Sequence, residues 1–306
     1  MDRAPPRRVL FSDADDERVR AALAALADSA SVRPVLLGAS GLPGVESLDP
    51  AALPSRERLG QALAERRALP PRVAARILER PANLALALLA DGAVDAAVIG
   101  VTSHTADLLI ACEMMLGPAG GATLAAGLFV MEVPGYGGPQ GERLVFADCA
   151  VHPNPTAEQL AAVAVAAADG ARALLGVEPR VALLSFSTHG SATHPDVDKV
   201  ARATDIARAA RPELAIDGEL QADAALDAAV AGHKLAAAGG VAGRANVLVF
   251  PDLDAANIGY KLVRTLAGAA AVGAFVRGYD RPVAKLSRGA TAREIVATAA
   301  LLAAPR

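Results

Sequence analysis

The sequence has 306 residues, of which 53% are hydrophobic and 21% charged, so it can bury the cores of two ordinary domains and is too apolar for a disordered chain. Thirty Lys and Arg residues against 33 Asp and Glu give a net charge of −3, and only 3% of residues are aromatic, which makes nucleic acid an unexpected partner. Two cysteines cannot form a disulfide framework, no apolar run reaches the about 18 residues of a membrane span, and no secretory signal opens the sequence, which indicates a cytoplasmic protein without a membrane partner.

Short runs rich in leucine and β-branched residues alternate with longer segments of helical period. This alternation predicts an α/β fold with mainly parallel sheets flanked by helices. The expected strands are, in chain order, residues 8–12, 34–38, 96–100, 124–133, 144–147, 181–186, 245–250 and 271–276. The expected helices are residues 15–26, 71–90, 105–116, 156–175, 196–210, 220–229, 255–267 and 291–302.

Two clusters of glycine and proline interrupt the middle of the chain, at residues 117–121 and 134–141. The second cluster separates two otherwise complete α/β halves, so we expect a domain boundary near residue 140. The halves should pack closely and leave a cleft between them, which is the default position for a binding site.

Several common signatures are absent from the sequence: the glycine-rich dinucleotide loop, the P-loop, Gly-x-Ser-x-Gly and His-Glu-x-x-His. The five histidines share no metal-ligand spacing with one another or with the cysteines, so no metal site is expected. Cys149 has apolar neighbours and no nearby cation in sequence, which favours an inert core thiol over a nucleophile.

Polar segments follow several of the predicted strands, where ligands of parallel α/β sheets bind. In the segment that contains Ser187 and Gly190, hydroxyls and backbone N–H groups could converge on an anion, or could form an ordinary loop. Asn257 and Lys261 are four residues apart and share one helical face, although a solvated lysine would have the same spacing. Residues 146–159 and 216–221 also join a strand to a helix and carry polar groups.

The segment that begins at Lys285 is a candidate phosphate clamp. Ser287 and Arg288 precede a glycine at the start of a predicted helix, so a hydroxyl, a guanidinium and the helix dipole lie together. Thr291 and Glu294 have the spacing of a capping box, which explains Glu294 without any chemistry.

Taken in order, five segments of the chain resemble the phosphate acetyltransferase and phosphate butyryltransferase family: FADCAVHPNPTAEQL, LLSFSTHGSA, IDGELQ, NVLVFPDLDAANIGYK and KLSRG. Weaker matches in the first half are VLFSDADDERV and DGAVDAAVIGVTSHTADLL. The resemblance implies one α/β domain of residues 1–140 and 290–306, a second of residues 141–289, an active-site cleft between them, and a homodimer.

The resemblance also implies the reaction, in which acetyl-CoA and inorganic phosphate reversibly give acetyl phosphate and coenzyme A (CoA). CoA is a substrate, and no metal or bound cofactor is required. The implied catalytic residues are Ser287, Arg288 and Glu294, which stands where the family has an aspartate base. The implied substrate-binding residues are Ser187, Thr188, Gly190, Ser191, Asn257, Tyr260 and Lys261.

These roles agree with the chemistry of the reaction. A CoA thiol has a pKa near the cysteine value of about 8.5, so a carboxylate can help to remove its proton as the sulfur attacks the acyl carbonyl. Arg288, Ser287 and the loop donors would stabilise the negative charge that grows on the departing phosphate.

The chain departs from the family at three positions. Ile110 stands where the T-A-D-x-x-R motif has arginine, a second family arginine falls near Ala64, and His189 stands where lysine is common. A site that lacks two cations should bind anions less well. Arginines that could take their place from elsewhere in the sequence are Arg66, Arg67 and Arg143.

Direct transfer in a ternary complex is the leading hypothesis, since no Ser-His or Cys-His pattern indicates a covalent acyl-enzyme. One alternative is a phosphate acyltransferase that prefers a longer acyl group such as butyryl, which an apolar Ile110 would suit. An alternative from another class is a non-catalytic module that senses acetyl-CoA, because the same fold occurs as a regulatory domain in some malic enzymes. The retained Ser287 and Arg288 favour the enzyme.

Overall fold

The computed structural model describes residues 5–101, 104–119, 124–235 and 239–304. Thr102 and Ser103 of the first-half match, and part of the glycine cluster at 117–121, lie outside the described residues. The chain forms two compact units: unit 1 is Met1–Gly121 with Tyr279–Arg306, and unit 2 is Ala122–Gly278.

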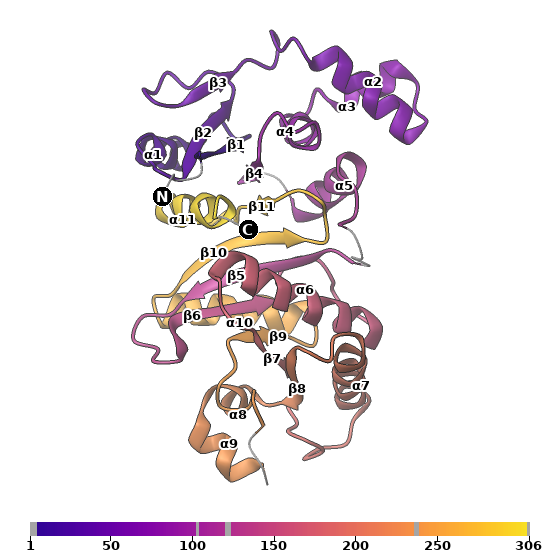
Figure 1. Ribbon diagram of the computed structural model, residues 1–306, viewed down its shortest axis with the longest axis vertical. Coiled ribbons are helices and arrows are strands. Elements are labelled where there is room, and N and C mark those ends of the chain that lie inside the picture. The colour runs from indigo at the N-terminus through magenta and orange to yellow at the C-terminus, as the bar shows by residue number, and fades with distance from the viewer. Residues whose placement is uncertain (1–4, 102–103, 120–123, 236–238, 305–306) are drawn as a thin grey trace. The chain divides into compact units, whose positions relative to one another are not determined.

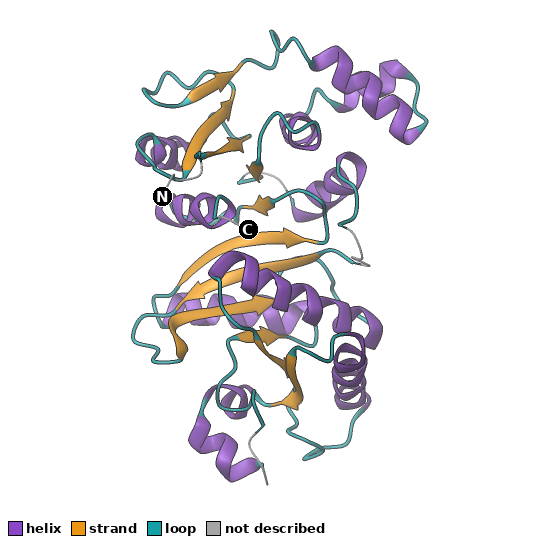
Figure 2. Ribbon diagram, in the orientation of Figure 1, coloured by secondary structure: helices purple, strands orange, loops and turns teal. Residues whose placement is uncertain are grey.

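Unit 1 is built on a parallel sheet with the strand order β3-β2-β1-β4-β11 (Figures 1 and 2). Its strands are β1 (Arg7–Phe11), β2 (Val32–Leu37), β3 (Glu46–Leu48), β4 (Ala96–Ile99) and β11 (Val283–Lys285). Its helices are α1 (Glu17–Leu26), α2 (Arg56–Arg67), α3 (Pro71–Ile77), α4 (Pro81–Ala90), α5 (Thr105–Met115) and α11 (Ala292–Leu302). The order reverses between β1 and β4, and ligands of such sheets bind at this reversal, beyond the carboxyl ends of the strands.

Helices cover both faces of the unit 1 sheet, with α1 and α11 together on one side and α4 and α5 together on the other (Figure 1). The central strands are therefore continuous apolar runs, and Val9, Leu10 and Phe11 of β1 are fully buried. The single helix expected at 71–90 is two helices, because Pro81 has no N–H to continue a helix and instead begins α4.

Unit 2 has a mixed sheet with the order β10-β5-β6-β9-β7-β8, in which β5 runs antiparallel to both of its neighbours and the remaining pairs are parallel. Its strands are β5 (Ala126–Glu132), β6 (Pro139–Ala147), β7 (Arg180–Leu184), β8 (Ala215–Leu220), β9 (Val247–Val249) and β10 (Ala270–Arg277). Its helices are α6 (Ala157–Leu175), α7 (Pro195–Ala210), α8 (Ala222–Leu226), α9 (Ala228–Lys234) and α10 (Leu253–Leu266). The expected α/β fold with a mostly parallel sheet flanked by helices is confirmed.

The glycine- and proline-rich stretch at 134–141 lies in a hairpin. It connects β5 to the antiparallel strand β6, in which Phe146 pairs with Phe129, and both strands belong to unit 2. The compact units divide after Gly121 and after Gly278, whereas the domain limits expected from the sequence, at 140 and 289, stay a prediction. Glycine and proline punctuate hairpin turns as well as linkers, so the cluster alone did not distinguish the two.

A buried carboxylate fixes the connection from β6 to α6. Asp148 is 5% exposed, and its Oδ1 accepts hydrogen bonds from the backbone N–H groups of Gly127 at 3.0 Å, Ala150 at 2.9 Å and Val151 at 3.1 Å. Its Oδ2 accepts from the backbone N–H of His152 at 3.0 Å and lies 2.8 Å from Nδ1 of that ring. Asp148 thus joins the loop to β5, which gives the segment FADCAVHP a structural task.

Replacing Asp148 with Ala should lower the free energy of unfolding by about 3 kcal/mol, because one buried and three partly buried N–H groups lose an acceptor, at about 1–3 kcal/mol for a buried group. Urea unfolding followed by circular dichroism measures the loss. Asp205→Ala, at an exposed position of α7, is the matched control and should change stability by less than about 0.5 kcal/mol. Equal stability of the two variants would contradict this role for Asp148.

Candidate active site

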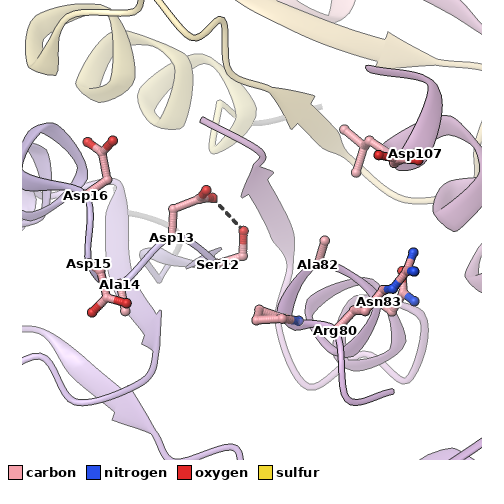
Figure 3. A pocket seen from close by; sticks show the side chains of 11 residues that line it. Ser12, Asp13, Ala14, Asp15, Asp16, Arg80, Ala82, Asn83 and Asp107 are labelled. Carbon is pink, nitrogen blue, oxygen red and sulfur yellow. Dashed lines mark hydrogen bonds between the residues drawn. The ribbon is translucent and has the colours of Figure 1, made fainter. Parts of the chain in front are cut away.

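In unit 1, the strand ends on both sides of the order reversal carry polar groups that bond to one another. Asp13 follows β1, and its Oδ2 accepts hydrogen bonds from the backbone N–H of Gly100, just after β4, at 2.9 Å and from Oγ of Ser12 at 2.7 Å (Figure 3). The backbone N–H of Leu286 donates to the carbonyl of Ile99 at 2.9 Å. The residues that follow β11, Ser287 and Arg288, therefore lie at this same edge of the sheet.

The turn at Ser287 and Arg288 is held through its backbone. The N–H of Ala290 donates to the carbonyl of Ser287 at 2.9 Å, and the guanidinium of Arg18 in α1 donates to the carbonyls of Arg288 at 2.6 Å and Ala290 at 3.1 Å. Arg18 is in turn fixed by Asp16 at 2.7 Å. Among the residues that the structure describes, the exposed guanidinium of Arg288 has no hydrogen-bond or ion-pair partner, so it can bind an anion.

Glu294 closes a capping box at the start of α11. Its Oε2 accepts hydrogen bonds from the backbone N–H of Thr291 at 2.8 Å and from Oγ1 of Thr291 at 3.1 Å, and the side chain is 5% exposed. The carboxylate therefore has a structural task at a helix terminus. Its role as the base stays a prediction.

A cavity of about 500 Å³ lies where the strand order of unit 1 reverses. It is lined by Ser12, Asp13, Ala14, Asp15, Asp16, Arg80, Pro81, Ala82, Asn83, Asp107 and Leu108. Figure 3 shows Arg80, Asn83 and Asp107 on the opposite side of this cavity from the loop after β1. Arg80 and Asn83 were not predicted as site residues from the sequence. Pro81, which begins α4 between them, was the sequence feature that could have indicated a helix start at this cavity.

In unit 2, hydrogen bonds join the loop after β7 to the end of β8. The carboxylate Oε1 of Glu219 accepts from Oγ of Ser187 at 2.8 Å and from the backbone N–H of Gly190 at 2.7 Å. Oγ1 of Thr188 donates to Oε1 of Gln221 at 3.1 Å. Ser187 and Thr188 are buried, so their hydroxyls shape the loop, and direct binding of substrate by them stays a prediction.

Ser191 and His189 complete this loop. Oγ of Ser191 accepts a hydrogen bond from the backbone N–H of Thr188 at 2.9 Å. His189, with a φ of +44°, places Nε2 at 3.1 Å from Oδ1 of Asp217, and the same oxygen accepts from Arg208 at 2.7 Å. His189 therefore stands beside a carboxylate that is already neutralised by an arginine.

Replacing Glu219 with Ala should lower the free energy of unfolding by about 2–4 kcal/mol, because a buried hydroxyl and a partly buried N–H lose their acceptor. Glu219→Gln keeps an acceptor oxygen of the same reach and should retain most of the stability. Denaturant titration compares the two variants with the parent protein. A Gln variant as unstable as the Ala variant would show that the negative charge, and not the acceptor, holds the loop.

The three predicted binding residues on α10 differ in their environments. The ring of Tyr260 is buried and packs against Phe129 with a centroid distance of 4.8 Å, which makes Tyr260 part of the core. Lys261 is exposed, with Nζ 5.5 Å from the centre of the Tyr260 ring, and Asn257 is half-buried. Asn257 and Lys261 thus have accessible side chains and Tyr260 supports the helix beneath them, and substrate binding by the three residues stays a prediction.

The arginines that could compensate for Ile110 and Ala64 are engaged elsewhere. Arg66 donates to the carbonyl of Met115, and Arg67 donates to carbonyls of the last turn of α5, including that of Met114 at 3.0 Å. These cations cap the carboxyl end of a helix, where they are stabilising. Arg143 forms an ion pair with Glu132 at 3.1 Å.

Both cysteines are buried thiols. Burial, with a smaller contribution from Glu113, raises the pKa of Cys112 to about 12, and burial together with Asp148 raises the pKa of Cys149 well above its usual value. Within the described ranges, no three His, Cys, Asp or Glu side chains are grouped so that they could hold a metal ion. No helix among the described residues is both long and apolar enough to cross a membrane.

The raised pKa of each cysteine means that almost no thiolate is present at pH 8. The native protein should therefore react slowly with Ellman's reagent at pH 8, whereas both thiols should react at once in guanidinium chloride. Rapid release of a full equivalent from the native protein would show a reactive thiol and reopen a covalent mechanism.

The fold and the open guanidinium define the class, an α/β protein that can bind an anion at the carboxyl edge of a parallel sheet. A family model described as "Phosphate acetyl/butaryl transferase" matches residues 2–303. A phosphate acetyltransferase of Paracoccus denitrificans is 39% identical over 304 residues, which are 98% of this chain and 95% of the relative. The chain belongs to the phosphate acetyl/butyryl transferase family.

Two further comparisons agree with this assignment. A phosphate acetyltransferase of Thermoanaerobacterium thermosaccharolyticum is 52% identical over 209 residues, which are 68% of this chain and only 63% of that relative's length. The crystal structure of a phosphotransacetylase from Streptococcus pyogenes superposes with a TM-score of 0.87 and 35% identity, covering 97% of this chain and 93% of the other.

Proposed function

We propose that this protein transfers an acetyl group reversibly between CoA and inorganic phosphate. The chain is a phosphate acetyltransferase, an acyltransferase whose substrates are acetyl-CoA with phosphate in one direction and acetyl phosphate with CoA in the other. The single observation that carries the proposal is the turn at Ser287 and Arg288, which presents an open guanidinium at the edge of a parallel sheet in a chain of this family.

The chemistry proceeds by attack of the CoA sulfur on the carbonyl carbon of acetyl phosphate. The carbon–sulfur bond forms, the bond from carbon to the phosphate oxygen breaks, and phosphate leaves with the electron pair. The guanidinium of Arg288 binds the departing oxygens and stabilises their growing charge, and Oγ of Ser287 supplies a further hydrogen bond. The buried, protonated cysteines fit direct transfer in a ternary complex without an acyl-enzyme.

The thiol proton needs an acceptor, and Glu294 is the proposed base. Its Oε2 accepts hydrogen bonds from Thr291, and a carboxylate has a second oxygen that can take a proton while the capping box stays closed. Glu294→Gln is therefore expected to lower kcat, whereas Thr291→Ala, which removes from the carboxylate only the hydrogen bond of Oγ1, should retain activity.

Substrate binding by unit 2 is proposed for the loop Ser187, Thr188, Gly190 and Ser191 and for Asn257, Tyr260 and Lys261 of α10. The hydrogen bonds to Glu219 give the loop a fixed shape, and Lys261 adds an exposed cation. We further propose that these residues meet Ser287 and Arg288 in one cleft. The domain limits at 140 and 290 and the homodimer stay predictions. The cytoplasmic location and a reaction without metal or bound cofactor stay predictions as well.

The proposal is tested by Arg288→Ala, which should lower kcat/KM for acetyl phosphate by about 100-fold or more, the usual effect of removing a donor to the developing negative charge. Formation of acetyl-CoA, followed at the thioester absorbance, measures the loss. Arg293→Ala, on the exposed side of α11, is the matched control and should keep near-parental activity. Intact activity of the Arg288 variant would contradict the proposal that Arg288 binds the departing phosphate.

The alternative acyl group is tested with the same assay. The names of the relatives, phosphate acetyltransferases, favour the acetyl group as the one that this protein transfers. A higher kcat/KM for butyryl-CoA would instead assign a longer-chain phosphate acyltransferase. Binding of acetyl-CoA without turnover of either thioester would assign a sensing module.

A further inference from the structure

Lys285 is a largely buried lysine that has no hydrogen-bond or ion-pair partner among the described residues. It is the last residue of β11, pairs in register with Ile99 of β4, and is 8% exposed. Within the described part of the chain, its ammonium makes no hydrogen bond and no ion pair. Its Nζ is not among the fully enclosed unpaired polar atoms of the described residues, so the buried stem carries the ammonium to the protein surface. The ammonium is therefore open to an anion that the described residues do not provide.

The charges around Lys285 point to the same conclusion. Burial, and next the positive charge of Arg288, lower the pKa of Lys285, whereas Asp13 acts in the opposite direction. Asp13 is not within ion-pair distance of the ammonium, and it already accepts hydrogen bonds from Gly100 and Ser12. Two cations thus stand at one edge of the sheet, and a bound dianion would relieve both their repulsion and the desolvation of the lysine.

We propose that Lys285 binds the phosphate group of acetyl phosphate or inorganic phosphate together with Arg288, Lys285 from the buried side and Arg288 from the exposed side. This inference rests on the proposed function and adds a second cation to the proposed phosphate site. It also accounts for the family arginines missing at Ile110 and Ala64, since Arg66, Arg67 and Arg143 are bonded elsewhere. A lysine suits the buried position, because its ammonium is a compact point charge that reaches phosphate without a planar fork.

The test is Lys285→Met, which keeps the length of the side chain and removes its charge. The KM for inorganic phosphate should rise about tenfold or more, the loss expected for one charge-assisted hydrogen bond, while the KM for acetyl-CoA changes little. Lys285→Arg restores a cation and should recover part of the phosphate affinity. The matched control is Lys199→Met, because Lys199 bonds Asn154 and Pro251 in unit 2 and should leave the KM for phosphate unchanged.

Binding of inorganic phosphate measured by titration calorimetry separates this inference from the proposed function. If the parent protein binds phosphate but shows no acetyl transfer, the proposed function fails, and the comparison with Lys285→Met still decides whether the lysine holds the anion. A folded Lys285→Met protein with parental phosphate affinity overturns the inference. A rise confined to the KM for acetyl-CoA overturns it as well, because the lysine would then contact a phosphate of CoA. If the Met variant does not fold, Lys285→Gln is judged by the same criterion.

Discussion

Carboxylates that accept hydrogen bonds from backbone N–H groups fix the loops on which this protein's chemistry depends. Asp13 joins the ends of β1 and β4, Asp148 joins the start of the β6–α6 loop to β5, and Glu219 closes the loop after β7. Loop N–H groups at a strand end have no partner in the sheet, and an unpaired one costs about 1–3 kcal/mol when it is buried. Acceptors supplied by side chains therefore determine the shape of each loop.

Hydrogen-bond partners also separate the polar groups that build the site from those that are open to a ligand. Ser187, Thr188 and Glu294 have their polar atoms bonded within the protein. Arg288 and Lys285, among the described residues, do not. A preorganised donor is effective in catalysis because no protein hydrogen bond has to break when charge develops on the substrate. The open cations at the edge of unit 1 meet this requirement better than the closed loop of unit 2.

The α/β pattern and most strand positions could be predicted from the sequence because parallel strands buried on both faces are short apolar runs between amphipathic helices. β8 was missed because Asp217, Gly218 and Glu219 break its apolar pattern, and α2 was missed because charged residues dominate Arg56–Arg67. The order of motifs predicted the family, which the comparisons confirmed.

The environment of each site residue could not be predicted in the same way. Spacing alone allowed Glu294 to be either a base or a cap, and only the positions of its oxygens show the capping box. The sequence alone did not predict a role for Lys285. Whether a lysine side chain is buried without an ion-pair partner depends on contacts between residues distant in the chain, such as those of β11 with β4. Hydrogen-bond satisfaction is a property of three-dimensional neighbours, and sequence periodicity does not report it.

The central claim, direct acetyl transfer between phosphate and CoA, is tested most directly by isotope exchange. Purified protein is incubated with acetyl phosphate and ³²P-labelled inorganic phosphate, with and without CoA, and the label in acetyl phosphate is counted. The account predicts exchange only when CoA is present, because phosphate departs only on attack by the thiol. Exchange without CoA would show a covalent acyl-enzyme, and no exchange in either mixture would show that the protein does not transfer acetyl groups between phosphate and CoA.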